Sequence, residues 1–229
     1  MTHHANLHLT VHTTGVSKAP ALLSTEQAAS AQLAQRLART GLALGPAMSW
    51  GRTSTLDMVH NRRPAVIFLD VPSASEQQLT GLVRAARLLA PVTVLPPDGQ
   101  DTLTAFTAGA LNVLDRKAPA AELAWRIRAD LRSCPPPPAS TRHISWSAGQ
   151  SLLFDILAAA RTPVCCHHLR LLMGSPGLPM NLRALKARIH RMRPALAQSG
   201  MTLVVDQQWG LATFRTQPAD SVALLTLLA

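Results

Sequence analysis

Hydrophobic positions in the first 132 residues follow two alternating patterns. Short apolar runs typical of strands lie at Asn6–Val11, Ala43–Met48, Ala65–Val71, Val92–Leu95 and Leu111–Leu114. Segments with helical periodicity follow at Thr25–Thr40, Thr53–Asn61, Glu76–Leu89, Asp101–Ala108 and Pro119–Arg132. Five consecutive strand–helix units predict an α/β fold with a doubly wound, parallel five-stranded sheet.

The remaining residues follow a different order. Helical patterns cover Ala148–Ala160, Cys165–Met173 and a long segment from Asn181 to about Arg193 or a little beyond, where Pro194 should kink or end the helix. A short extended piece is expected at Ile144–Trp146. A hairpin is expected from Met201–Val205 and Trp209–Phe214, with its turn at Asp206–Gln208. Three helices followed by a hairpin is the order of a winged helix-turn-helix.

A run of four prolines, Pro135–Pro138, separates the two patterns. Such a run joins neither a helix nor a central strand and favours a stiff polyproline II linker. We therefore expect an α/β domain at 1–132, a linker at 133–143, a winged helix domain at 144–216 and an apolar tail at 217–229. The alternative, a surface loop within one domain, stays open.

The charge balance narrows the class of partner. The 229 residues contain 22 Lys+Arg against 12 Asp+Glu, a formal net charge of +10. This excess favours a polyanion, first nucleic acid and second an acidic membrane surface. No apolar run is long enough for a membrane span and no signal segment is recognisable, so we expect a cytoplasmic protein without a membrane partner. Three cysteines are too few for a disulfide framework.

The long helix near residues 181–196 is the strongest candidate for binding a polyanion. Its apolar residues form one stripe: Leu182, Leu185, Ile189, Met192 and Leu196. The other faces carry Arg183, Lys186, Ala187, Arg188, His190, Arg191 and Arg193. No acidic residue lies between 174 and 205, so the helix cannot balance these cations internally. Phosphates explain this pattern better than a solvated basic face, which remains the alternative.

These residues resemble the effector domain of OmpR/PhoB-type response regulators. The similarity is carried by ISWSAGQSLLFDILAAARTPVCCHHLRLL, LRALKARIHRMRPALAQSG and LVVDQQWGLATF, over about 70 residues. The family pattern departs at Gln208, which replaces a glycine, and at Leu211, which replaces a tyrosine. The resemblance implies a recognition helix in the major groove and a wing at Gln207, Gln208 and Trp209.

The first part resembles the receiver domain of the same family, through PAVIFLDVPSASEQQLTGLVRAARLLAPVTVL and AGALNVLDRKAPAAELAWRIRADL. Asp70 matches the phosphoacceptor. The expected first strand ends Val11-His-Thr-Thr14 without the acidic pair that holds Mg²⁺, and Pro96 replaces the hydroxyl residue. We therefore favour a strand-end carboxylate paired with Arg116 or Lys117 over a working phosphoacceptor.

The combined prediction is a sequence-specific, DNA-binding transcription regulator with an atypical receiver that acts without aspartyl phosphorylation. Double-stranded DNA and a second copy of the chain are the expected partners, and RNA polymerase is a further candidate. The dimer face is expected within residues 101–132, around Trp125 and Leu131. Arg183, His190 and Arg191 should meet base edges, and Lys186, Arg188 and Arg193 should meet phosphates.

The alternative function is a ligand sensor, in which a small molecule binds beside Asp70 and Pro96 and tunes DNA binding. No residue set supports an enzyme, and no cofactor is expected. The run Cys165–His168 invites a zinc site. Four consecutive residues at a helix start point around the axis rather than to one centre, so no metal is expected.

Overall fold

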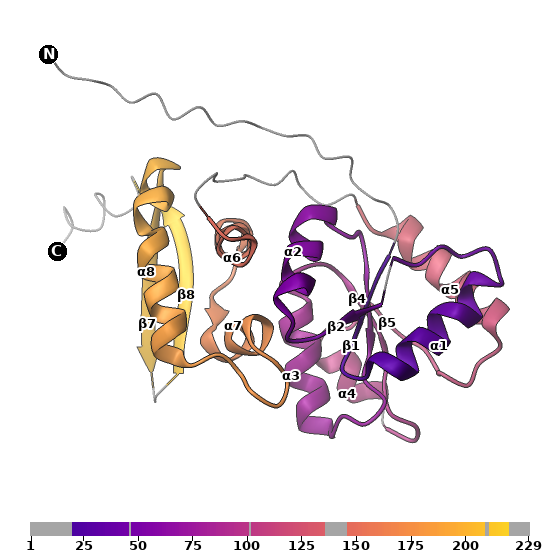
Figure 1. The fold of residues 1–229 in the computed structure, drawn as a ribbon. Coiled ribbons are helices and arrows are strands. Elements are labelled where there is room, and N and C mark those ends of the chain that lie inside the picture. Colours follow the sequence, from indigo (N-terminus) through magenta and orange to yellow (C-terminus); the bar gives the residue numbers. More distant parts are fainter. Residues whose placement is uncertain (1–19, 46, 101, 136–145, 209–210, 220–229) are drawn as a thin grey trace, which may run out of the picture.

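The computed structural model describes residues 20–45, 47–100, 102–135, 146–208 and 211–219. These residues form two packed halves, the N-terminal half (residues 20–135) and the C-terminal half (residues 146–219), as Figure 1 shows.

The N-terminal half contains one parallel sheet. Its strands are β1 (Ala21–Ser24), β2 (Met48–Ser49), β3 (Ile67–Asp70), β4 (Val92–Leu95) and β5 (Asn112–Val113). All neighbouring pairs are parallel, in the order β2-β1-β3-β4-β5. The predicted doubly wound five-stranded sheet is confirmed, and this strand order is that of the flavodoxin-like doubly wound folds.

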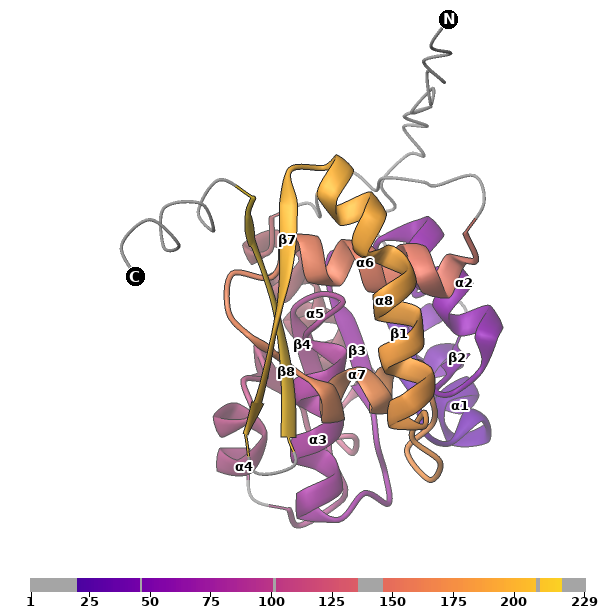
Figure 2. The same cartoon turned by 90° about the vertical axis from the view of Figure 1, so that its left-hand side faces the viewer.

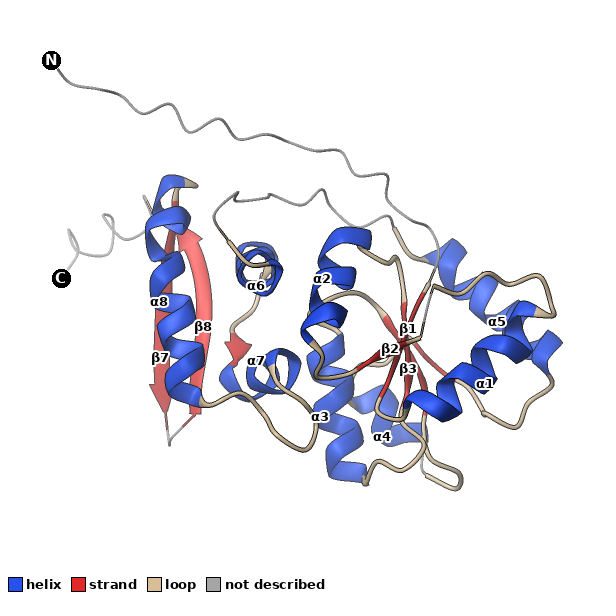
Figure 3. Ribbon diagram, in the orientation of Figure 1, coloured by secondary structure: helices blue, strands red, loops and turns tan. Residues whose placement is uncertain are grey.

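Helices cover both faces of the sheet (Figure 3). On one face lie α1 (Gln27–Ala38) and α5 (Ala120–Ser133), and on the other lie α2 (Thr53–Arg62), α3 (Glu76–Ala86) and α4 (Thr102–Thr107). Successive strand residues serve opposite faces: Phe68 packs with α1 and α5, whereas Ile67 and Leu69 pack with the other layer. Burial on both faces explains why the strands read as continuous apolar runs.

The first strand was predicted in the wrong place. Asn6–Val11 lies outside the described residues, and the strand at this position of the sheet is Ala21–Ser24. The segment ALLS is fully buried, so it lacks the alternation of apolar and polar residues that drew attention to Asn6–Val11. The predicted helix Thr25–Thr40 consequently begins later, at Gln27, and Glu26 becomes the residue that joins β1 to α1.

The C-terminal half contains the three predicted helices and the hairpin in the predicted order, together with a strand, β6, that was not predicted. Its elements are α6 (Ala148–Ala159), β6 (Val164–Cys165), α7 (Cys166–Met173), α8 (Leu182–Gln198), β7 (Met201–Gln208) and β8 (Leu211–Pro218). The strands form an antiparallel sheet in the order β6-β8-β7. Of the predicted extended piece Ile144–Trp146, only Trp146 lies within the described residues, and it is not in a strand.

Two predicted boundaries in this half were wrong. Helix α8 continues through Pro194 to Gln198, because Ala195 and Leu196 beyond the proline are buried with Met192. The missing proline N–H costs less than this packing contributes. The hairpin is also longer than predicted: pairing extends from Met201↔Pro218 to Gln208↔Leu211, so 206–208 belongs to β7 and β8 extends beyond residue 216.

The two halves share one apolar core. Helix α2 packs on α6 and α3 packs on α7, and a single buried cluster runs from Leu69 in β3 to Ile189 in α8. At its edge the Trp50 indole N–H donates to the Leu171 carbonyl at 2.8 Å, although 121 residues separate them. The proline-rich segment lies mostly outside the described residues, so the linker boundaries stay a prediction. The halves on either side of it are nevertheless docked, not separate.

Candidate nucleic-acid interface

Helix α8 lies on the outer side of the molecule. It packs against α6, α7 and β7, and Figure 1 shows α6 and α7 between it and the five-stranded sheet, while Figure 2 shows it facing the viewer. Asn181 caps its start by accepting a hydrogen bond from the Arg183 amide at 2.8 Å. Leu185, Ile189 and Met192 are buried, so the predicted apolar stripe faces the core.

The predicted polar residues are on the remaining faces of α8. Arg183, Ala184, Ala187, His190, Arg191 and Arg193 are exposed, and Lys186 and Arg188 are half-buried. Among the described residues, no ion pair involves an α8 side chain. Ala184 and Ala187 leave the middle of the exposed face low, so the backbone can approach a partner closely between the flanking cations.

Arg188 differs from the other cations of this helix. A Cβ atom built on Gly149 would lie 3.8 Å from the Arg188 Nη1, so the guanidinium reaches over the start of α6. The first turn of α6 therefore lies beside a cation, an arrangement that suits a phosphate at the rim of the face.

Two of the three predicted wing residues lie in the described part of the hairpin. Gln207 and Gln208 are exposed at the end of β7, and Trp209 lies outside the described residues. Because β7 runs antiparallel to α8, the loop end of the hairpin lies toward the same end of the molecule as the start of α8 (Figure 2). The exposed α8 residues and the wing glutamines can therefore face one extended partner.

The Asp70 site is closed by a cation. Asp70 ends β3 with an exposed fraction of 0%, and its carboxylate forms an ion pair with Arg116. Ser30 donates to the second carboxylate oxygen at 2.7 Å. Burial lowers the pKa of Arg116 and nearby Arg36 adds to this, while Glu26 opposes it. Of the two cations considered from the sequence, Lys117 instead contacts Asp98 at 2.6 Å.

The shift of β1 also corrects the predicted lack of carboxylates here. Glu26 lies two residues after the end of β1 and acts electrostatically on Arg116, so one acidic residue lies near Asp70. Glu26 accepts a hydrogen bond from Ser73, and the guanidinium of Arg116 occupies one oxygen of Asp70. Mg²⁺ requires several oxygen ligands and is repelled by a guanidinium, so these residues do not fit a magnesium ion.

The predicted dimer face is only partly as expected. Trp125 is 66% exposed on α5, but Leu131 is half-buried and packs into the core between α5 and the sheet. The sequence did not single out three further exposed apolar residues, Leu103, Phe106 and Leu111, on α4 and before the edge strand β5. Their exposure depends on which helix face meets the sheet, and the short α4 pattern left that open.

The run Cys165–His168 spans the end of β6 and the start of α7. Cys166 is buried and His167 is exposed, so neighbouring side chains point in different directions. Within the described ranges, no three His, Cys, Asp or Glu side chains converge as metal ligands. The described helices also include none with the length and apolar character that a bilayer crossing requires.

Comparisons with known proteins concern the arrangement of the chain. No protein-family model and no curated protein matches it. Among solved structures, response regulator DrrB, a Thermotoga maritima OmpR/PhoB homologue, shares 16% identity with a TM-score of 0.35 over 86% of this chain and 97% of its own. Response regulator ChrA of a heme-sensing two-component system shares 17% at 0.38, over 80% and 91%.

A further similar structure covers about half of this chain. A CheY-like protein, TadZ of Pseudomonas aeruginosa, shares 22% identity with a TM-score of 0.38, over 52% of this chain and 98% of its own. The solved structures named here are thus two response regulators and a CheY-like protein. Sequence identities and TM-scores this low say nothing about the ligands or partners of this chain.

The geometry at Asp70 predicts the outcome of phosphodonor treatment. Incubation with acetyl phosphate and Mg²⁺ should leave the intact mass unchanged, because Arg116 blocks a fully buried carboxylate. Asp70→Asn should leave DNA affinity nearly unchanged while lowering the free energy of unfolding by about 3 kcal/mol or more, since Arg116 loses its charged partner. The matched variant Asp98→Asn, which breaks only the exposed pair with Lys117, should not change stability measurably. A gain of one phosphoryl group, lost in Asp70→Asn, would contradict this.

Proposed function

We propose that the protein is a sequence-specific DNA-binding transcription regulator of the winged helix-turn-helix type. The observation that carries the proposal is the outer face of α8, where Arg183, His190 and Arg191 are exposed together and no acidic side chain from the described residues pairs with them. Duplex DNA carries regularly spaced negative phosphates, which can pair with the positive side chains of this face.

The dimensions of the face favour the major groove. A single helix with a low centre at Ala184 and Ala187 suits a groove that admits one α-helix. Arg183, His190 and Arg191 then reach base edges, where arginine pairs with guanine through two hydrogen bonds. Lys186, Arg188 and Arg193 lie at the sides and meet phosphates, and Gln207 and Gln208 reach the backbone or the minor groove beyond.

Regulation by aspartyl phosphorylation is not part of this proposal. The ion pair between Asp70 and Arg116 fills the position where a phosphoryl group would attach, so the N-terminal half acts as a scaffold that supports α6 and α7. No arrangement of described side chains supports an enzymatic reaction. RNA polymerase stays a candidate partner, and no contact among the described residues tests it.

A second copy of the chain is the proposed partner of the α4–β5–α5 edge. Phe106 and Trp125 expose 47% and 66% of their side chains on the two helices that flank the edge strand β5. Exposed apolar groups of this size on a folded protein mark interaction surfaces. A symmetric contact would place two copies of α8 on half-sites about one helical turn apart.

The DNA proposal predicts two kinds of loss. Arg183→Ala should weaken binding to the preferred site by about 1–3 kcal/mol and flatten discrimination at one base position, because a base contact is lost. Arg193→Ala should weaken all sequences alike and lower the salt slope by about 1, because a phosphate contact is lost. Fluorescence anisotropy on a duplex library at several salt concentrations measures both. Arg39→Ala, an exposed cation on α1, is the control and should change neither. A binding constant that does not vary with salt would remove the nucleic-acid assignment.

The dimer proposal predicts a change in mass. Phe106→Glu with Trp125→Glu should convert the dimer to a monomer in light scattering and weaken binding to a two-half-site operator, because charge enters an apolar contact. Leu178→Glu changes an equally exposed residue in the α7–α8 loop and should leave the dimer intact. A wild-type chain that is monomeric at micromolar concentration, or a dimer that survives the double change, would show that this edge is not the interface.

A further inference from the structure

A cavity lies between the two halves, at the opposite end of the parallel strands from Asp70. It has a volume of about 600 Å³. Its walls come from the ends of α2, α3 and α4, which precede β3, β4 and β5, and from α6, β6 and the start of α7. The cavity is therefore at the amino ends of the strands. The ligand crevice considered from the sequence, beside Asp70 and Pro96, is at their carboxyl ends.

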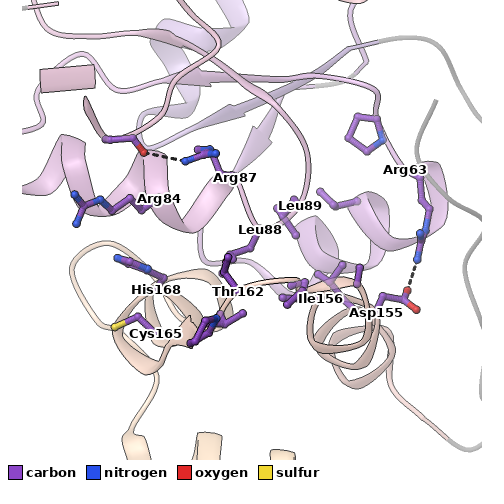
Figure 4. A pocket seen from close by; sticks show the side chains of 18 of the residues that line it. Arg63, Arg84, Arg87, Leu88, Leu89, Asp155, Ile156, Thr162, Cys165 and His168 are labelled. Atoms are coloured by element: carbon purple, nitrogen blue, oxygen red, sulfur yellow. Dashed lines mark hydrogen bonds and ion pairs between the residues drawn. The ribbon is translucent and has the colours of Figure 1, made fainter. Parts of the chain in front are cut away.

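The cavity has a cationic rim. Arg84 and Arg87 project from the last turn of α3, three residues apart, and His168 faces them from α7 (Figure 4). Among the described residues no carboxylate pairs with Arg84 or Arg87. The only carboxylate in the cavity wall, Asp155, is already paired with Arg63. Two positive charges thus remain uncompensated at one end of the cavity.

The rim is held in place by its surroundings. The Arg87 guanidinium donates to the Ala108 carbonyl at 3.5 Å and lies across Gly109, where an added Cβ would be 2.0 Å from its Nη1. Burial lowers the pKa of His168 to about 4, and His167 and Arg84 add to this, so the imidazole is neutral at pH 7. A neutral imidazole donates one hydrogen bond without adding charge.

Apolar side chains line the part of the cavity between the cationic rim and the Arg63–Asp155 ion pair. Leu88 and Leu89 follow α3, Ile156 lies on α6, and Val164 belongs to β6. Figure 4 shows Leu88, Leu89 and Ile156 lining the part of the cavity away from Arg84. Small-molecule sites typically combine such an apolar wall with a few polar groups at one end, and the volume is within their range.

We infer that this cavity binds a small amphipathic acid, with its carboxylate between Arg84, Arg87 and His168 and its apolar body against Leu88, Leu89 and Ile156. The charge of the rim selects an anion, and the apolar wall selects against a fully hydrated one. Because the walls belong to both halves, the bound acid stabilises their docked arrangement. Binding requires neither DNA nor the Asp70 site, so it stands independently of the proposed function.

The experiment uses three probes on the full-length chain: octanoate, octanol and sulfate. Isothermal titration calorimetry should show one octanoate per chain, with at least tenfold weaker binding of octanol and of sulfate. Octanoate should also raise the melting temperature in proportion to the logarithm of its concentration. Octanol binding as tight as octanoate would remove the role of the arginines, and equally tight sulfate would remove the role of the apolar wall.

Variants locate the site. Arg84→Gln with Arg87→Gln should weaken octanoate at least tenfold and lower the unliganded melting temperature only slightly, since both side chains are exposed and only the Arg87–Ala108 hydrogen bond is lost. Ala159→Trp, on the cavity side of α6, fills the apolar part and should weaken octanoate to a similar degree with the arginines intact. Arg126→Gln, an exposed cation on α5, should leave binding unchanged. Undiminished binding in both cavity variants, or no octanoate binding at millimolar concentration, would overturn the assignment.

Discussion

The apolar contact of α2 and α3 with α6 and α7 is the constraint on which the rest of the structure depends. Leu82 and Val83 on α3 and Leu169 and Leu172 on α7 belong to one buried cluster, so neither half can expose its face of this contact without a large loss of buried apolar area. The Trp50–Leu171 hydrogen bond and the Arg63–Asp155 ion pair fix the register of the two halves at the edge of the cluster.

This contact decides which surfaces of the C-terminal half stay free. Helices α6 and α7 are used for docking, and α8 is left on the outer side with its cations in solvent. The same packing forms the cavity with Arg84 and Arg87 at its rim. The Asp70 site takes no part in the contact between the halves, because Arg116 neutralises its charge within the N-terminal half. We therefore regard the docked halves as one body that presents the proposed DNA-binding face without rearrangement.

The sequence predicts the strongly patterned parts of this fold. The run Ala65–Val71 and the amphipathic stripe of α8 identify β3 and the outer helix, because burial on two faces leaves a continuous apolar run and burial on one face leaves a helical period. Short elements are poorly predicted, because they contain too few residues to show a pattern. The four residues of β1 carry no period, so the strand was placed at Asn6–Val11 and Glu26 was missed. Pro194 shows the opposite error, where tertiary packing of Leu196 overrides a local rule.

The candidate sites also differ in how well the sequence predicts them. Every predicted α8 residue is on that helix, because spacing alone assigns helix faces. The pairing of Asp70 with Arg116 rather than Lys117, the burial of Leu131 and the cavity between the halves depend on contacts between residues far apart in the chain. No local pattern carries that information, since each partner reads as an ordinary loop or helix residue on its own.

Hydrogen–deuterium exchange of the full-length chain with and without its operator tests the central claim most directly. The account predicts slower exchange in the exposed turns of α8 and at the loop end of the β7–β8 hairpin, with no change along α3, α7 or the Trp50–Leu171 contact. Faster exchange at that contact on DNA binding would show that the halves separate, and slower exchange confined to surfaces other than α8 would contradict the proposed DNA-binding face.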